Sequence, residues 1–273
     1  MQLAVHHILN FLHEWAPPKT KFDYDNVGLL IGYAQQPVVR ILTCLDVTEA
    51  IADEAINRNA DLIVAHHPLI FKQLKQITKD SEKGRTLFKL ISNDISVIAA
   101  HTNLDAAHHG VSWKLAETLG LDEITFLDES EDFAATGMGA VGVYNEPISR
   151  DDFLSILCQR LSTDAVRYSG APESVQKVAV CGGAGVFLTG QATNIQADAF
   201  VTADIKYHNY FLDNKKFLLV DVGHYESEIP IVDDLRAKIA EKFEDLEVFK
   251  ANTNTNPMHI FTSENSVNLK SYK

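Results

Sequence analysis

The sequence predicts an α/β fold in which most strands run parallel. Short apolar segments typical of buried strands alternate along the chain with longer amphipathic segments typical of helices. Such apolar strands are expected where helices cover both faces of a parallel sheet. With 273 residues and a 46% hydrophobic composition, the chain is large enough to bury the core of one large or two medium domains.

The first half of the chain contains a strand–helix–strand unit. Its strands are RILTCLDV (40–47) and DLIVA (61–65), and Thr48 lies where it can cap the helix between them. A helix between two strands is the usual connection of a parallel pair, so this unit predicts the direction of the sheet. The pattern continues with a helix at 82–94, a strand at 95–100 and a helix at 111–120.

A second set of elements follows an acidic segment. LDEITFLDESEDFAAT (121–136) has no clear hydrophobic period, so we expect a linker there. The alternation then resumes and runs to a polar tail that begins at Asn252. The expected strands are 137–145, 175–180, 199–204, 216–222 and 246–251, and the expected helices are 151–161, 185–196, 205–214 and 229–246.

Composition and charge exclude several classes of protein. The formal net charge of −13 makes attraction to a phosphate backbone unfavourable, so we do not expect a nucleic-acid partner. No apolar run approaches the roughly 18 residues that a membrane helix needs, and we expect a cytoplasmic protein with no membrane partner. The three cysteines are far apart and lack CxxC spacing, so we interpret them as reduced core thiols.

Three of the expected strands run into residues that bind metals. The strand at 61–65 is followed by His66 and His67, the strand at 95–100 by His101 and Asp105, and the strand at 216–222 by His224 and Glu228. The carboxyl ends of parallel strands share one edge of a sheet, which is where α/β proteins place their sites. These side chains are therefore expected to converge.

The residue types predict a class of metals rather than one metal. Imidazole and carboxylate ligands without thiolates suit Zn, Fe, Mn, Co or Ni. Three histidines and two carboxylates are more than one catalytic zinc usually takes, so we expect two divalent metal ions per chain.

Each of these residues also has a simpler interpretation. The two adjacent histidines could form a polar turn with Pro68, Asp105 could cap the next helix, and Glu228 could favour the N-terminus of a helix opened by Pro230. Taken together, the simpler interpretations require three separate strand ends to carry ligand chemistry by chance. We therefore favour the metal site.

Five segments together resemble the Nif-three-like family of dinuclear metal proteins, which in bacteria is named GTP cyclohydrolase 1 type 2. They occur in the family's order and are DNVGLLIG (25–32), HHPLIF (66–71), HTNLDAA (101–107), TADIKYH (202–208) and GHYESE (223–228). The resemblance implies two interlinked α/β domains, which we place at 1–125 plus about 216–273 and at about 126–215. It also implies a homo-oligomer, a ring-shaped hexamer built as a trimer of dimers, with its metals facing the internal cavity.

The resemblance further implies a ligand set. His67 and Asp105 would hold one metal, His66 and His224 the other, and Glu228 would bridge both.

Several other residues in or near these segments raise separate expectations. His101 and His208 are candidates for proton transfer or for holding a ligand in place, and each could equally be a hydrogen-bonded structural histidine. His108 and His109 replace the family's usual Pro and Gly turn, and we interpret them as surface histidines. CGGAG (181–185) lacks the full GxGxxG spacing, so close packing is expected there rather than phosphate binding.

A pair of metals can activate water and polarise the group under attack, which predicts a hydrolase acting on a small molecule. The resemblance implies a nucleotide as the substrate: GTP, whose ring would be opened with release of formate. The residues themselves do not select guanine. Phosphoester hydrolysis by the same metals is one alternative, and a non-catalytic scaffold or regulator that depends on metal is another.

Overall fold

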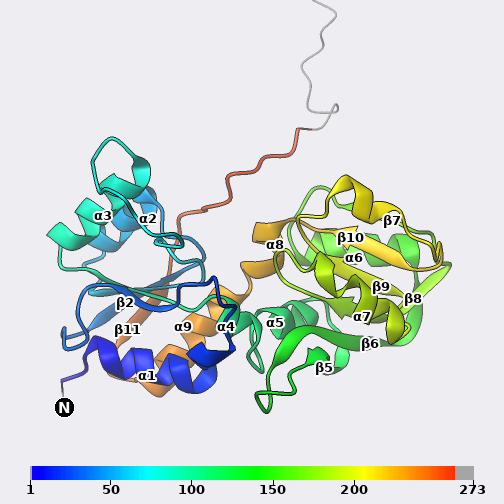
Figure 1. Cartoon of the computed structure of the whole chain (residues 1–273), viewed down its shortest axis with the longest axis horizontal. Helices are drawn as coiled ribbons and strands as arrows, with labels where there is room; N and C mark the ends of the chain where they lie inside the picture. The colour runs from blue at the N-terminus through cyan, green and yellow to red at the C-terminus, as the bar shows by residue number, and fades with distance from the viewer. Residues whose placement is uncertain (1, 262–273) are drawn as a thin grey trace, which may run out of the picture.

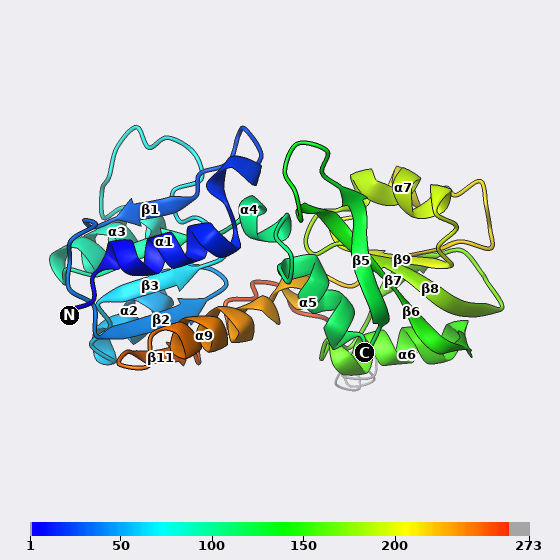
Figure 2. The ribbon, with the colours of Figure 1, turned by 90° about the horizontal axis from the view of Figure 1, so that it is seen from below.

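The computed structural model describes residues 2–261 and shows two lobes side by side (Figures 1 and 2). Each lobe is built around one β-sheet, and three short helices lie where the lobes meet: α4 (Thr102–Asp105), α5 (Val111–Thr118) and α8 (His224–Glu228) (Figure 1). Within the described part of the chain, no helix is long and apolar enough to cross a membrane. The predicted α/β fold is confirmed.

The first lobe holds a five-stranded sheet with the order β1-β4-β3-β2-β11. Its strands are β1 (Gly28–Ile31), β2 (Arg40–Cys44), β3 (Leu62–Ala65), β4 (Ser96–Ala99) and β11 (Glu247–Lys250). The strands β4, β3, β2 and β11 are parallel, as predicted. The edge strand β1, which the sequence pattern did not reveal, runs antiparallel to β4.

Helices cover both faces of this sheet. On one face, α1 (Val5–Trp15) and α9 (Ile231–Lys242) pack through residues such as Leu12 and Leu235. On the other face, α2 (Glu49–Asn57) and α3 (Glu82–Ser92) pack through residues such as Ile51 and Leu90. The predicted cap is present, because the Thr48 hydroxyl accepts a hydrogen bond from the Ile51 backbone N–H. Burial on both faces explains why β2, β3 and β4 are apolar over most of their length.

The second lobe holds a six-stranded mixed sheet with the order β5-β6-β8-β9-β10-β7. The strands β8, β9 and β10 are parallel, and the remaining pairings are antiparallel. One face packs on α5 and α6 (Arg150–Arg160), and the other face packs on α7 (Thr189–Asn194). The strands are β5 (Asp122–Glu129), β6 (Gly137–Ser149), β7 (Arg167–Ser169), β8 (Ser174–Val180), β9 (Ala199–Thr202) and β10 (Leu218–Asp221).

The expected linker at 121–136 is wrong over half of its length, because β5 occupies 122–129. This edge strand pairs with β6, with Phe126 opposite Ala140. Its acidic residues face solvent while Leu127 is buried, and an edge strand tolerates such charges. Because these charged residues interrupt the hydrophobic pattern, the sequence alone did not indicate a strand here.

Two other expectations change in detail. The helix expected at 205–214 is a single turn, η3 (Tyr207–Tyr210), and the one expected at 185–196 divides into the turn η2 (Val186–Leu188) and α7. The boundary expected near residue 216 precedes β10, which pairs in the second sheet. We therefore propose that the second domain extends through β10.

The cysteines are free thiols in the structure. Cys44 and Cys181 are buried and Cys158 is half-buried. Burial, reinforced by the nearby charge of Asp105, raises the pKa of Cys181 to about 12, so this thiol stays protonated at neutral pH.

Candidate metal centre

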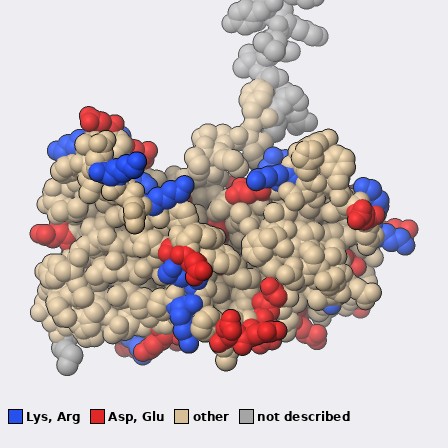
Figure 3. All heavy atoms as spheres, in the orientation of Figure 1, with Lys and Arg blue, Asp and Glu red and all other residues tan. Residues whose placement is uncertain are grey.

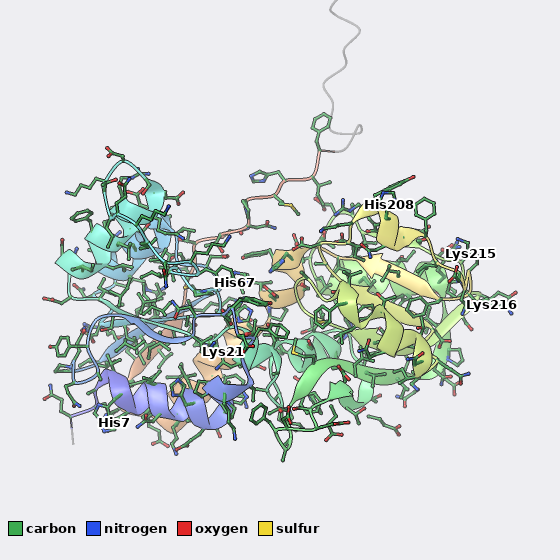
Figure 4. All side chains as sticks on the ribbon, viewed as in Figure 1. His7, Lys21, His67, His208, Lys215 and Lys216 are labelled. Atoms are coloured by element: carbon green, nitrogen blue, oxygen red, sulfur yellow. The ribbon has the colours of Figure 1, made fainter. Side chains whose placement is uncertain are left out.

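The predicted ligands converge between the two lobes. His66 and His67 directly follow β3, and Asp105 lies in the single turn α4 that follows β4. His224 and Glu228 lie at the two ends of α8, after β10. Figure 4 places His67 between the lobes. The expectation of one shared sheet edge is wrong: β10 belongs to the second sheet, so the site forms where the strand ends of two sheets meet.

Glu228 lies at the centre of this cluster. Its Oε2 is 2.9 Å from His67 Nε2 and 3.1 Å from His224 Nε2. Its Oε1 is 3.8 Å from His66 Nε2, which is also 3.6 Å from Asp105 Oδ1. The side chain of Glu228 reaches this position across one turn of α8, because residues four apart share a helix face.

Ligand atoms of three residues lie within 4.8 Å of one another in three overlapping groups. The groups are His66, Asp105 and Glu228; His67, His224 and Glu228; and His66, His67 and His101. The first two differ from the pairing that the resemblance implies, which joined His67 to Asp105 and His66 to His224. The third adds His101 to the five expected ligands.

Each of the four imidazoles in these groups also makes a hydrogen bond through its Nδ1 atom. When Nδ1–H donates this hydrogen bond, Nε2 is the ring nitrogen left to bind a metal, as is usual for metal-binding histidines. The acceptors are the Ala100 carbonyl for His66 (2.8 Å), Asp46 for His67 (2.7 Å), Asp25 for His101 (2.8 Å) and Asp204 for His224 (2.8 Å).

The sequence interpretation missed these three aspartates. Asp25 and Asp204 lie inside segments that carry the family resemblance, and Asp46 lies two residues after the end of β2. Their position at or beside a strand end was the available signal, but an aspartate in a loop is too common to be recognised as a histidine partner.

The residues present fit a metal ion. Among residues 2–261, the buried atoms His66 Nε2, Asp105 Oδ1 and Glu228 Oε2 have no hydrogen-bond partner, whereas buried polar atoms are normally paired. Nε2 lone pairs facing carboxylate oxygens repel each other unless a cation or a proton lies between them. The cluster could therefore hold a metal ion.

The carboxylates raise the pKa values of two of the histidines. Burial alone would lower the pKa of His67, but the nearby carboxylates of Asp46 and Glu228 favour the charged ring more strongly and raise this pKa to about 10. Burial likewise opposes the charged form of His224, and the contacts with Glu228 and Asp204 raise its pKa to about 9. Without metal, both rings are therefore positively charged imidazolium ions at neutral pH.

The pKa values of the other three residues of the cluster shift in different directions. Burial lowers the pKa of His66. Burial and the charge of Glu228 hold the pKa of Asp105 well above its usual range. Burial would also raise the pKa of Glu228, but its histidine contacts hold it well below the usual range. The pair thus has one carboxylate that stays charged and one that is easily protonated when no metal is present.

A glycine permits Glu228 to approach the loop after β8. Gly183 has a φ of +61°, and a Cβ atom at this position would overlap Glu228 Oε1. The Gly183 backbone N–H donates a hydrogen bond to Ser227 Oγ at 2.9 Å. CGGAG therefore packs closely against the cluster, in line with the expected role of this segment.

The structure does not bring His208 to the cluster. His208 is exposed on η3, where its ring stacks on Phe211, and Figure 4 shows it in the second lobe, away from His67. His108 and His109 are also exposed and pack around Trp113, with ring centroids 4.2 and 5.2 Å from the indole. None of these three histidines belongs to a metal-competent group within the described residues.

The surface is hollowed between the two lobes (Figure 3). Aromatic side chains of both lobes form a series of ring contacts that begins at His101 of the cluster. Phe71 lies edge-on to His101, with ring centroids 6.0 Å apart, and Tyr24 lies edge-on to Phe71 at 6.1 Å. Phe22 stacks on Tyr24 at 5.4 Å and meets Phe187 of the second lobe at 6.4 Å. Tyr24 and Phe187 are 67% and 54% exposed. We call these four residues the aromatic rim. They expose ring surface to solvent near the cluster.

Comparison with known proteins gives relatives over nearly the whole chain. Residues 3–257 match the family Duf34/NIF3 (NGG1p interacting factor 3). A Clostridium perfringens protein named GTP cyclohydrolase 1 type 2 homolog is 33% identical over 245 residues, which cover 89% of this chain and 93% of that protein. A Streptomyces coelicolor protein with the same name is 33% identical and is covered to 88%, as is this chain.

Solved structures share the fold. A Staphylococcus aureus hypothetical protein matches with a TM-score of 0.89 at 28% identity, covering 96% of this chain and 100% of that chain. A Bacillus cereus protein related to NIF3 matches with a TM-score of 0.87 at 25% identity, covering 95% and 99%. Sequence and fold agree over the same residues, and the chain belongs to the Duf34/NIF3 family.

Proposed function

We propose that the chain binds two divalent metal ions in this cluster and acts as a metal-dependent hydrolase on a small molecule. The observation that carries the proposal is the buried Glu228 carboxylate, which faces the Nε2 atoms of three histidines whose Nδ1 atoms are engaged elsewhere. A carboxylate in that position can bridge two ions. We assign His66 and Asp105 to one ion and His67 and His224 to the other, following the groups in which their atoms lie.

When bound, two such ions would activate water for attack at neutral pH and polarise the group attacked. The chain's own residues prepare the site for this chemistry. Glu228 offsets the mutual repulsion of the ions. The Asp25 carboxylate holds Nδ1 of His101, whose ring centroid lies 5.2 Å from that of His66 and 5.5 Å from that of His67, and its other nitrogen would accept and return a proton during turnover. The proton-transfer role of His208 remains a prediction from sequence, because its exposed position adds no support.

The aromatic rim supports a substrate with a planar ring. Stacking of a base on an aromatic side chain is worth about 1–3 kcal/mol. The names of the relatives suggest GTP, and the proposed reaction is the opening of the guanine ring with release of formate. The ring-shaped hexamer and the cytoplasmic location also remain predictions.

Formate release from GTP tests the proposed reaction. The metal-loaded chain should release formate in a coupled formate dehydrogenase assay, and the metal-free chain should release none. Tyr24→Ala should raise KM for GTP by about tenfold, within the energy of one stacking contact. Phe88→Ala, which removes an exposed ring on α3, should leave KM unchanged.

Other outcomes of the same assay would redirect the assignment. Turnover of bis(p-nitrophenyl) phosphate without formate release would favour a phosphoesterase. Absence of turnover with either substrate, together with a partner bound only by metallated protein, would favour a scaffold or regulator.

Metal uptake near pH 7.5 should release at least one proton from each of His67 and His224, because their pKa values of about 10 and 9 keep both protonated without metal, and coordination needs the neutral rings. Titration calorimetry in buffers of different ionisation enthalpy measures this release, and zero release would exclude these two ligands. Metal affinity should fall as pH decreases from 7.5, because protons then compete more strongly with the metal for the same imidazole nitrogens. The sign for the metal-free fold is opposite: the stabilisation from both raised pKa values is complete below about 6.5 and disappears as pH rises through 9 and 10.

A further inference from the structure

The segment after β11, which the sequence presents only as a polar tail, contacts both lobes. Figures 1 and 2 show it leaving β11 and crossing near α8. Thr253 and Thr255 are half-buried while Asn252 and Asn254 are exposed, the alternation of an extended chain with one face on the protein. The segment 252–256 is therefore packed against the molecule in a fixed register.

Three carboxylates accept hydrogen bonds from this segment. Glu54 of α2 accepts from the Thr253 hydroxyl at 2.7 Å, as well as from two backbone N–H groups. Asp46 accepts from the Thr255 hydroxyl at 2.6 Å. On α8, Glu226 accepts from the Asn256 side-chain amide at 2.8 Å. Glu54 otherwise pairs with Arg58, whereas Asp46 accepts a hydrogen bond from the candidate ligand His67, and Glu226 belongs to the helix that carries His224 and Glu228.

Asp46 is held at both of its oxygens. Its Oδ1 accepts from His67 Nδ1 at 2.7 Å, and its Oδ2 accepts from Thr255 Oγ1 at 2.6 Å. The carboxylate is only partly buried, with a third of its side chain exposed, so burial alone does not fix its orientation. The Thr255 hydroxyl is the second point that stops this carboxylate from rotating away from the imidazole.

We propose that Thr255 is a positioning residue of the metal centre, which acts through Asp46 on His67. Asn256 adds a second contact of the segment with the site, because it donates to Glu226 of α8, the helix that carries His224 and Glu228. The segment thereby links His67, which follows β3, to α8, which carries His224 of the same proposed ion. Loss of the Thr255 contact should lower the affinity for that ion and leave the affinity for the ion assigned to His66 and Asp105 nearly unchanged.

The expected size of the effect follows from known outer ligands. Removing a direct partner of a metal-binding histidine typically lowers metal affinity by about 10–100-fold. Thr255 contacts the histidine only through Asp46, so we expect the affinity for one of the two ions to fall about tenfold. Thr255 has this role only if the cluster binds metal as proposed, whereas the proposed reaction is not required.

The test compares three variants of the full chain by titration of the metal-free protein with Zn²⁺ against a chromogenic chelator. Thr255→Val removes the hydroxyl and should lower the affinity for one ion about tenfold. Thr255→Ser keeps a hydroxyl and should bind that ion with the affinity of the wild type. Thr253→Val removes an equivalent hydroxyl–carboxylate bond in the same segment, but to Glu54, and should bind both ions like the wild type. The visible spectrum of the Co²⁺-loaded protein should change only in Thr255→Val.

Should Thr255→Val fold poorly, a double-mutant cycle of Asp46→Asn with Thr255→Ala, which also lacks the hydroxyl, gives a readout that does not depend on it. If Thr255 acts through Asp46, the two losses do not add, and the double variant binds as weakly as Asp46→Asn alone. Additive losses, equal effects of Thr253→Val and Thr255→Val, or no rescue by serine would each overturn the proposal. Failure of the wild-type chain to bind two ions would instead contradict the proposed function.

Discussion

Replacing Glu228 by Gln is expected to remove both metal ions together. The substitution keeps the size of the side chain but replaces the carboxylate that lies 2.9 Å from His67 Nε2 and 3.8 Å from His66 Nε2 by a neutral amide. Two dications about 3.5 to 4 Å apart repel each other strongly, and an anion between them offsets that repulsion. Both affinities should fall by more than about 100-fold, beyond the loss typical of outer residues.

The matched control for this variant is His66→Ala. His66 faces Asp105 and Glu228, so its removal should deplete mainly the ion assigned to those residues. Metal content per chain, measured by mass spectrometry at equal folded fraction, separates the two cases. If Glu228→Gln kept two ions per chain, the bridging role of Glu228 would be wrong.

The second large effect is expected from Gly183→Ala. An added methyl group would overlap Glu228 Oε1 and lie 3.3 Å from His224 Cε1, and the backbone at this position has a φ of +61°. Left-handed backbone costs a non-glycine residue about 1–2 kcal/mol, and the overlap must push Glu228 out of its bridging position. We expect metal affinity to fall by at least about tenfold and the free energy of unfolding to decrease by about 1–2 kcal/mol.

Gly190→Ala separates the local clash from a general effect of alanine. Gly190 lies in α7, and an added Cβ there meets no atom of the described residues within 4 Å. This variant should bind metal like the wild type and gain up to about 1 kcal/mol of helix stability. Equal metal affinity in the two alanine variants would show that Gly183 does not support the position of Glu228.

The sequence indicated the residues of the cluster because each follows an apolar strand. His66 and His67 directly follow β3, and such a change from apolar to ligand-type residues is visible without any structure. It did not reveal that β10 belongs to the other sheet, because strand order depends on pairings between distant segments. The site was therefore predicted by its residues but placed at the wrong kind of junction.

The groups behind the ligands could not be predicted in the same way. Asp46 lies 21 residues from His67 in sequence, and Thr255 lies 209 residues from Asp46. Nothing in a polar tail indicates which of its hydroxyls meets a carboxylate. The same limit explains why β5 was interpreted as a linker: its partner β6 and its one buried face decide its structure, and neither is visible in an acidic segment.

Anomalous scattering from crystals of the metal-loaded chain tests the central claim most directly. The account predicts two peaks about 3.5 to 4 Å apart on either side of the Glu228 carboxylate. One peak should lie beside His66 and Asp105, and the other beside His67 and His224. A single peak, or peaks away from the Nε2 atoms of these histidines, would contradict a dinuclear centre at this site.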